Sequence, residues 1–209
     1  MKVLLSTKQI IQVLETKKYK IFEGGEYNLN LVGIRSDNRV PNKFDDEFHV
    51  FWESNIGKWN HCKFACTTDP GTYWLNNPPD VMGVVGTAIL KPGQYRGAYQ
   101  IGLHRTYEAL VQTGGQVTIL RDTDKDNELD FDSKIEQTGF LGINIHRASP
   151  YNQTITVDNW SAGCQVIANP SDFELLMTIA RLSRRKYGNL FTYTLLVEAD
   201  FTVPYESNR

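Results

Sequence analysis

The chain has 209 residues, of which 41% are hydrophobic and 22% charged, and its formal net charge at pH 7 is −2. This composition is typical of a soluble globular protein with a sizeable core, and it excludes a disordered chain. Without a block of like charge there is no basic face for nucleic acid, which is therefore not expected as a partner. No apolar run approaches the roughly 18–20 residues of a membrane span, so a membrane-spanning segment is not expected.

The first forty residues are predicted to form an appendage to a main domain at residues 41–209. Ser6, or the threonine after it, can cap a short helix whose apolar residues recur at helical spacing. Residues 27–34 alternate and predict a strand. The polar stretch 36–43 contains a proline and is expected to be the loop that joins the two parts.

From residue 44 onward, short segments bounded by turn residues predict a β protein. Residues 55–58 are expected to turn a hairpin, and residues 107–112 are ambiguous between a helical turn and a strand. The apolar or alternating segments are residues 48–52, 59–67, 86–90, 94–103, 116–121, 139–146 and 191–197.

The clearest helix follows Asn169 and a proline. Ser171 and Glu174 form a capping-box pattern at its start, and Gly188 fits its end. Because strands outnumber helices, the predicted fold class is mainly β (α+β). We expect a sandwich-like or barrel-like sheet with one N-terminal and one C-terminal helix.

The strongest chemical signal is a histidine and a cysteine near the middle of the second half. A cysteine attacks as thiolate, which a neighbouring imidazole or backbone N–H groups favour. Cys164 follows Ser161, an alanine and Gly163, small residues that permit a turn aiming the Gly163 and Cys164 amides at one oxyanion. His146 ends an apolar strand, which would hold a general base rigidly. The same residues also fit a purely structural role.

Three motifs occur in the order found in the L,D-transpeptidase catalytic domain family, which the chain resembles over residues 44–166. His146 ends a Gly-Ile-Asn-Ile-His strand similar to the one that carries the family's catalytic histidine. Fourteen residues then separate His146 from Ser161. The Ser-Ala-Gly-Cys sequence ending at Cys164 is similar to the family's Ser/Thr-His-Gly-Cys box. Upstream, residues 90–95 resemble its Thr-Pro-x-Gly-x-Phe turn.

The resemblance implies a β-sandwich-like fold and a substrate class, the stem peptides of peptidoglycan. Cys164 would attack the carbonyl of an L-centre–D-centre peptide bond, with His146 as base and then acid. Gly163 and Cys164 would supply oxyanion N–H groups, and Ser161 would shape the turn. Transfer of the acyl group to an amine would give a cross-link. Transfer to water would give carboxypeptidase or endopeptidase cleavage, and no cofactor is required.

Three further residues are expected to bind substrate. Ala162 stands where the family has a second histidine, and Val166 where it has arginine or asparagine, so substrate choice is expected to differ. Arg147 would supply the missing positive charge. Trp160 is expected to wall the site, and His104 to line the substrate groove.

The N-terminal segment lacks the apolar core and small-residue cleavage site of a signal peptide. We therefore expect a protein that is made in the cytoplasm and acts at the cell wall after release, as a phage lysin does, or after delivery as an effector. One alternative is a non-catalytic binding or structural module on the same fold. An ordinary cysteine peptidase is less favoured, because such enzymes commonly place the cysteine before the histidine.

An oxygen-rich loop follows the segment 116–121 and resembles the first part of a calcium loop. It departs from an EF-hand because Asn127 replaces the glycine and Ser133 the final glutamate. A solvated acidic turn is the alternative, although closely spaced carboxylates repel one another without a cation. The candidate ligands are Asp122, Asp124, Asp126, Glu128 and Asp130.

Overall fold

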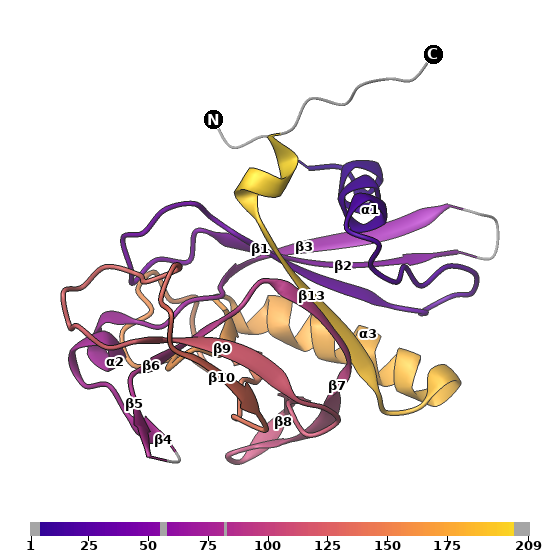
Figure 1. Cartoon of the computed structure of the whole chain (residues 1–209). Coiled ribbons are helices and arrows are strands. Elements are labelled where there is room, and N and C mark those ends of the chain that lie inside the picture. Colours follow the sequence, from indigo (N-terminus) through magenta and orange to yellow (C-terminus); the bar gives the residue numbers. More distant parts are fainter. Residues whose placement is uncertain (1–4, 55–57, 82, 203–209) are drawn as a thin grey trace.

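A computed structural model describes residues 5–54, 58–81 and 83–202. Eight strands hydrogen-bond side by side in a closed ring (Figure 1). Two neighbouring pairs, β1–β13 and β11–β12, are parallel, and the others are antiparallel. The predicted mainly β fold class is confirmed. In ring order the strands are β1 (Asn30–Arg35), β13 (Phe191–Val197), β7 (Gly93–His104), β8 (Tyr107–Val111), β11 (Ile145–Arg147), β12 (Gln165–Ile167), β3 (Trp59–Thr67) and β2 (Asp46–Glu53).

Two smaller sheets lie beside the ring, in the lower part of Figure 1. The three-stranded sheet and the short helix α2 share a small core. This core includes Leu75, Ile89 and Leu120. All its pairings are antiparallel, and so is the two-stranded one. The elements are β10 (Glu136–Gly139), β9 (Val117–Asp122), β6 (Thr87–Leu90), β4 (Asp80–Val81), β5 (Val84–Val85) and α2 (Thr72–Asn76).

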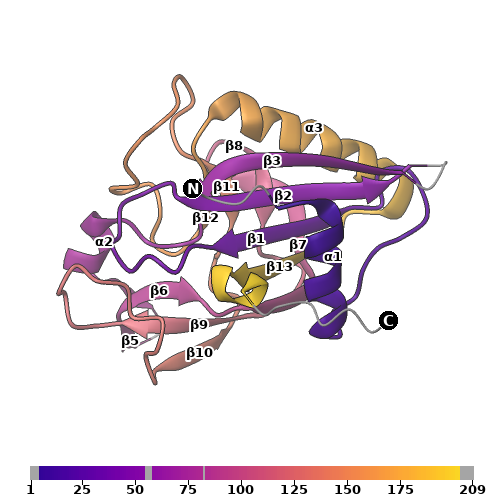
Figure 2. The ribbon, with the colours of Figure 1, turned by 90° about the horizontal axis from the view of Figure 1, so that it is seen from above.

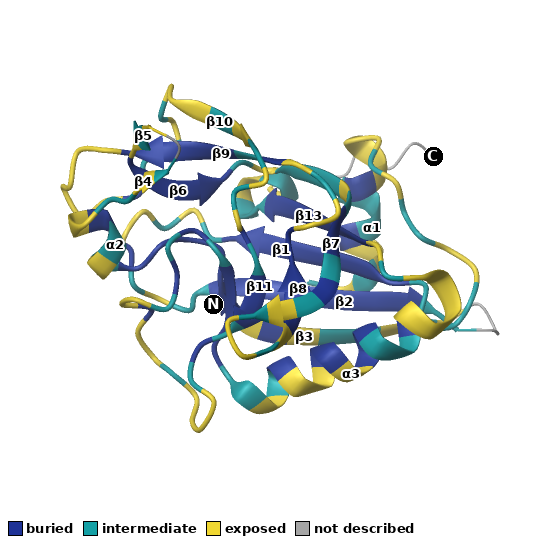
Figure 3. Ribbon diagram, turned by 90° about the horizontal axis from the view of Figure 1, so that it is seen from below, coloured by how far each residue is buried: buried dark blue, intermediate teal, exposed yellow. Residues whose placement is uncertain are grey.

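The two longer helices lie on different sides of the barrel (Figures 1 and 2), and α3 (Pro170–Tyr187) contacts β8, β11 and β12. Helix α1 (Thr7–Thr16) buries Ile10 in a cluster with Val32, whereas α3 packs into the cluster that contains Leu31. Successive residues of a strand face opposite sides, which explains why neighbours on β1 join different clusters. Figure 3 shows α3 with one buried and one exposed face. Among the described residues, no helix combines the length and apolarity needed to cross a membrane.

Part of the predicted N-terminal appendage belongs to the main sheet. Strand β1 lies between β13 and β2 in the ring, so it is part of the barrel wall and not of a separate unit. The expected boundary near residue 40 therefore does not coincide with a division of the sheet. A final 3₁₀ helix, η1 (Glu198–Phe201), returns to α1, where Lys17 and Asp200 form an ion pair of 2.7 Å.

The helix ends agree with the sequence except at one cap. Ser6 caps α1 and forms a capping box with Gln9. Helix α3 is capped by Asn169, whose side chain accepts the Ser171 N–H at 2.8 Å, so the prediction of Ser171 as the cap is wrong. Asn169 is the cap because Pro170, which lacks an N–H, fits the first position of a helix. The helix therefore starts at Pro170, two residues earlier than a cap at Ser171 would give. Gly188 ends the helix with φ of 86°, as predicted.

The predicted hairpin is confirmed, because β2 and β3 pair antiparallel along their length. Part of its predicted turn, residues 55–57, lies outside the described residues. In the ambiguous segment 107–112, residues Tyr107–Val111 form strand β8. Tyr73 and Trp74 lie in helix α2.

The single strand predicted for residues 139–146 is wrong. An irregular stretch separates β10 from β11. Gln112 causes this break, because its Oε1 accepts the N–H groups of Leu141 at 2.8 Å and Gly142 at 2.9 Å. Gly142 adopts φ of 71°, a left-handed conformation that suits glycine. His146 consequently lies in the middle of a three-residue strand.

A buried cluster of charges lies where β1, β2 and the end of β3 meet. Arg35, 1% exposed, donates to Thr68 Oγ1 at 3.0 Å and to the carbonyl of Leu90 at 2.9 Å. Its Nε lies 2.8 Å from Asp69 Oδ1. Because that N–H points at Thr68, Oδ1 receives positive charge but no hydrogen bond. Burial raises the pKa of Asp46, and it raises that of Asp69 to about 7.

A chain of side-chain hydrogen bonds ties α1 to the barrel. Thr7 Oγ1 lies 2.9 Å from His61 Nδ1, His61 Nε2 lies 2.8 Å from His49 Nδ1, and His49 Nε2 lies 3.1 Å from Glu47. The hydrogen bond to His49 lowers the pKa of Glu47 to about 2, and burial lowers that of His61 to about 4. These histidines therefore hold α1 in place, away from the predicted site.

Candidate active site

The predicted base lies on one of two neighbouring parallel strands, and the predicted nucleophile directly precedes the other. His146 lies on β11, opposite Val166 of β12, and Cys164 directly precedes β12. The Gln165 N–H donates to the carbonyl of Asn144 at 2.9 Å, which extends the pairing past the strand ends. Backbone hydrogen bonds thus bring the segments that carry the two predicted residues together, with Cys164 two residues before the partner of His146, although the two residues lie eighteen positions apart in the sequence.

Ser161 closes the turn before the cysteine. Its hydroxyl donates to the carbonyl of Cys164 at 2.8 Å and accepts the Gly163 N–H at 3.1 Å. Gly163 has φ of 117°, and a Cβ there would lie 2.4 Å from the carbonyl oxygen of Ala88, so only glycine fits. We predicted Gly163 as an oxyanion donor, but its N–H is taken up inside the turn. Of the two predicted amides, that of Cys164 remains as a candidate donor.

The Cys164 sulfur lies against the irregular stretch before β11. It accepts the Asn144 N–H at 3.4 Å and donates to the carbonyl of Gly142 at 3.5 Å. Burial raises the pKa of Cys164 to about 11, and the Asn144 amide opposes this shift. At neutral pH the group is therefore a thiol whose proton must be removed during the reaction.

His146 is buried and neutral. The residue is 4% exposed, and burial, followed by the neighbouring His104, lowers its pKa to about 3. Nδ1 lies 2.8 Å from the carbonyl oxygen of Arg147, so Nδ1 carries the proton and donates it there. Nε2 then holds the lone pair that a general base needs.

The sulfur is not hydrogen-bonded to the base in this conformation. The hydrogen bonds of Cys164 Sγ go to the backbone of Gly142 and Asn144. Those of the His146 ring go to the carbonyl of Arg147 and, at 3.5 Å, to the hydroxyl of Tyr107. A rotation of the thiol away from the Gly142 carbonyl is needed before it can meet the base, as is common in sites without substrate.

His104 lies at the site, where the sequence predicted it. Its ring stacks on His146 with centroids 4.2 Å apart and planes 12° apart. Its Nδ1 accepts the side-chain amide of Asn144 at 3.1 Å. Sequence reasoning missed Asn144 and Tyr107. Asn144 stands two residues before His146, so alternation along an extended segment could have flagged it.

The other two predicted substrate residues differ in their surroundings. The guanidinium carbon of Arg147 lies 4.1 Å from the centroid of the Tyr107 ring, and Arg147 lines a surface pocket. Trp160 is partly buried, and its N–H donates to the carbonyl of Val157. Among the described residues, no hydrogen bond or ring contact joins Trp160 to Cys164 or His146, and its expected role as a wall of the site stays a prediction.

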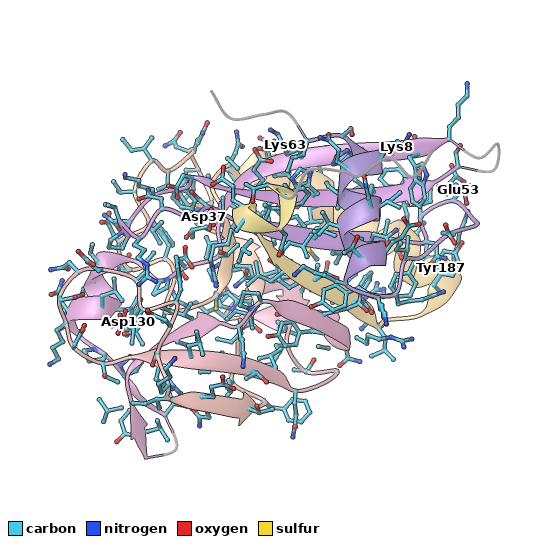
Figure 4. All side chains as sticks on the ribbon, turned by 45° about the horizontal axis from the view of Figure 1, so that its top comes forward. Lys8, Asp37, Glu53, Lys63, Asp130 and Tyr187 are labelled. Carbon is cyan, nitrogen blue, oxygen red and sulfur yellow. The ribbon has the colours of Figure 1, made fainter. Side chains whose placement is uncertain are left out.

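Three of the five acidic loop residues converge. Oxygens of Asp122, Asp124 and Asp130 lie within 4.8 Å of one another (Asp130 is labelled in Figure 4). Asp126 instead accepts the Glu128 N–H at 2.7 Å. Burial, followed by the neighbouring carboxylates, raises the pKa of Asp122 to about 6. The three converging residues could hold a divalent cation, and calcium binding here stays a prediction.

Neutralising Asp122 is expected to raise the melting temperature by a few degrees in a chelator. The folded state raises the pKa of this carboxyl, so its ionisation costs stability as the pH rises through about 6. If the loop binds calcium, the ion should stabilise wild type more than Asp122→Asn. Differential scanning fluorimetry with and without calcium tests this, with Asp126→Asn as the matched control. Equal calcium shifts in wild type and Asp122→Asn would exclude this site.

Comparisons with protein-family models, with curated proteins and with solved structures found no match. The function must therefore be argued from the residues and their geometry.

Proposed function

We propose that the chain is a cysteine-dependent acyl-transfer enzyme acting on the stem peptides of peptidoglycan, in the manner of the L,D-transpeptidase family. The observation that carries the proposal is the parallel pairing of β11, which carries His146, with β12, which Cys164 directly precedes, together with the backbone carbonyl that fixes the histidine tautomer. A nucleophile, a base and a group that orients the base form the arrangement that nucleophilic catalysis requires. The specificity for an L-centre–D-centre bond rests on the motif resemblance.

In the proposed reaction, Cys164 attacks the substrate carbonyl while its proton passes to Nε2 of His146. The Cys164 amide donates to the oxyanion of the tetrahedral intermediate. The imidazolium returns the proton to the leaving amine, the C–N bond breaks and a thioester remains. His146 then deprotonates water or an amine, which attacks the thioester and restores the thiol.

Water as acceptor gives L,D-carboxypeptidase or endopeptidase activity, and an amine gives transpeptidation. Hydrolysis agrees better with the proposed setting, in which the protein reaches the cell wall as a phage lysin or a delivered effector. No metal takes part in these steps.

The test incubates purified protein with defined muropeptides and follows products and intact protein mass by mass spectrometry. Wild type should form a product and a covalent acyl adduct on Cys164. Cys164→Ala should lose both, with a rate decrease of at least about 10³-fold. Cys62→Ala, which removes a partly buried thiol elsewhere, is the control and should keep wild-type activity. Identical product profiles for wild type and Cys164→Ala would refute the proposal.

A non-catalytic binding module on the same fold is the second candidate. It is favoured by one observation, the hydrogen bonds of the Cys164 sulfur to the backbone of Gly142 and Asn144 in place of one to His146. Burial raises the pKa of Cys62 as it does that of Cys164, which makes Cys62 a matched reference. The binding module predicts that iodoacetamide modifies Cys164 no faster than Cys62 and that no acyl adduct forms with muropeptides.

A further inference from the structure

Two histidine rings lie face to face in the candidate site. The rings of His104 and His146 stack with centroids 4.2 Å apart and planes 12° apart. Two positive charges at this separation repel each other strongly, so only one of the two rings can hold a proton taken up in a reaction. By residue type either imidazole could be the base. The hydrogen-bond partners of the two rings decide which one it is.

Asn144 fixes the tautomer of His104. The Asn144 Oδ1 accepts the Gln112 N–H at 2.8 Å, and because a backbone N–H only donates, the amide nitrogen is the end that faces His104. This Nδ2 lies 3.1 Å from His104 Nδ1. An amide NH₂ group also only donates, so His104 Nδ1 is the acceptor and the ring proton lies on Nε2. A doubly protonated His104 would lose this hydrogen bond and set two donors against each other.

His146 has the opposite tautomer. Its Nδ1 lies 2.8 Å from the carbonyl oxygen of Arg147, which only accepts, so Nδ1 carries the proton. The lone pair of His104 is occupied by Asn144. The lone pair of His146 is on Nε2, which accepts no hydrogen bond from any described residue. Of the two rings, His146 is therefore the one with a lone pair ready for a thiol proton.

The groups around the two rings agree with this assignment. Burial, followed by the positive charge of Arg105, lowers the pKa of His104. Burial and His104 lower the pKa of His146 to about 3, and Arg105 and Arg147 act in the same direction. No carboxylate of the described residues lies within ion-pair distance of either ring. Tyr107 meets His104 edge-on, with centroids 5.6 Å apart, and burial raises its pKa, so it stays an uncharged phenol.

Asn144 also binds the segment of the nucleophile. Its backbone N–H donates to Cys164 Sγ at 3.4 Å, and its carbonyl accepts the Gln165 N–H at 2.9 Å. One residue thus contacts the thiol through its main chain and, through its side chain, the ring that stacks on the base.

We propose that Asn144 is a positioning residue that assigns the thiol proton to His146 by holding the stacked His104 neutral. This inference rests on the proposed acyl-transfer function and deepens it. The proton of Cys164 passes to Nε2 of His146 and later to the leaving amine. His104 keeps its single proton on its own Nε2 throughout.

The tautomers can be measured in the resting protein without substrate. Nitrogen-15 NMR distinguishes a protonated ring nitrogen from one with a lone pair, and the signals of the four histidines are assigned by single substitutions. At pH 7 wild type should show His104 protonated at Nε2 and His146 at Nδ1. Asn144→Asp puts a carboxylate oxygen in place of the amide nitrogen and can still accept the Gln112 N–H. In this variant His104 should carry a proton on Nδ1, and its pKa should rise by about 1–3, the usual effect of an adjoining opposite charge.

The pH profile is a second readout, which a merely structural role of Asn144 would not move. In Asn144→Asp, kcat/KM on a defined muropeptide should fall at least about tenfold as the pH drops through the raised pKa of His104. Below that pH, two charged rings would be stacked when His146 takes the proton. Wild type should stay level over the same range. Asn60→Asp adds the same charge at an exposed position of β3, and this matched control should keep the wild-type tautomers and profile.

Three outcomes would each overturn the inference. They are a wild-type His104 protonated at Nδ1, a His104 tautomer unchanged in Asn144→Asp, and a level pH profile in that variant despite the changed tautomer. Melting temperatures show whether each variant folds, and the wild-type tautomers test the inference even if Asn144→Asp does not fold. Turnover with the wrong tautomers would overturn the inference alone. Absence of turnover by wild type with the expected tautomers would instead count against the proposed function.

Discussion

Replacing His146 with glutamine is expected to lower kcat on peptidoglycan stem peptides by about 10²–10⁴-fold, the usual contribution of a general base. Glutamine is polar and of similar length, but it is not a base. It cannot remove the proton from the Cys164 thiol, which stays protonated at neutral pH because burial raises its pKa. KM should change little, because the His146 ring is buried and has its hydrogen bonds within the protein. Steady-state rates on a defined muropeptide measure both constants.

The matched control is His61→Gln, since His61 lies in the chain of hydrogen bonds that ties α1 to the barrel. It should keep the wild-type kcat. If both variants lost the same activity, a general effect on the fold would replace the proposed role of His146 as base.

The pH dependence of kcat/KM distinguishes a site in which Cys164 and His146 are both neutral from one in which they form a thiolate–imidazolium ion pair. Burial lowers the pKa of His146 to about 3 and raises that of Cys164 to about 11, so base and thiol are both neutral between these values. Activity should therefore stay level down to about pH 4, because an imidazole with a depressed pKa charges only at lower pH. A fall centred near the ordinary histidine value of about 6.5 would contradict this buried, neutral base. Circular dichroism at each pH excludes unfolding.

Local patterns in the sequence predicted most of the regular structure. The strands predicted for residues 59–67 and 191–197 match β3 and β13 in their bounds, because the residues of each segment themselves favour a strand. The segment before His146 could not be predicted in this way. Its conformation depends on the side chain of Gln112, which lies about thirty positions away and takes the amide hydrogens that a sheet would otherwise use.

The candidate site divides in the same manner. The order of His146 and Cys164 could be read from the sequence, and the parallel pairing of β11 with β12 brings their segments together. The stacking of His104 on His146 comes from the turn between β7 and β8, a tertiary contact without a local signal. The Gly163 N–H donates to the Ser161 hydroxyl because of the geometry of the turn. Composition alone does not determine that geometry.

Replacing Arg35 with leucine is expected to cost about 3–5 kcal/mol of unfolding free energy, the usual result of removing one partner from a buried charge cluster. Asp46 and Asp69 would be left without their cation, at 2% and 6% exposure. The pKa of Asp69 is already raised to about 7, so its ionisation reduces stability as the pH rises through that value. The deficit of the variant should consequently be larger at pH 8 than at pH 5. Urea unfolding at both pH values measures it.

A control variant separates lost charge balance from lost packing. Arg35→Leu combined with Asp46→Asn and Asp69→Asn should recover part of the stability, because no buried carboxylate then lacks its cation. A cost below about 1 kcal/mol for Arg35→Leu alone, or a triple variant less stable than the single one, would contradict the electrostatic account.

The same arginine also supports the candidate site. It donates to the carbonyls of Thr68 and Leu90. Gln165, the residue after Cys164, donates to the same Thr68 carbonyl at 3.5 Å, and the strand that ends at Leu90 packs Ala88 beneath Gly163. Loss of Arg35 should therefore loosen the turn that presents the thiol. Arg35→Leu is therefore expected to lose activity at temperatures where the protein is still folded. The triple variant also lacks the Arg35 N–H groups that bind the Thr68 and Leu90 carbonyls, so it should recover stability without recovering full activity.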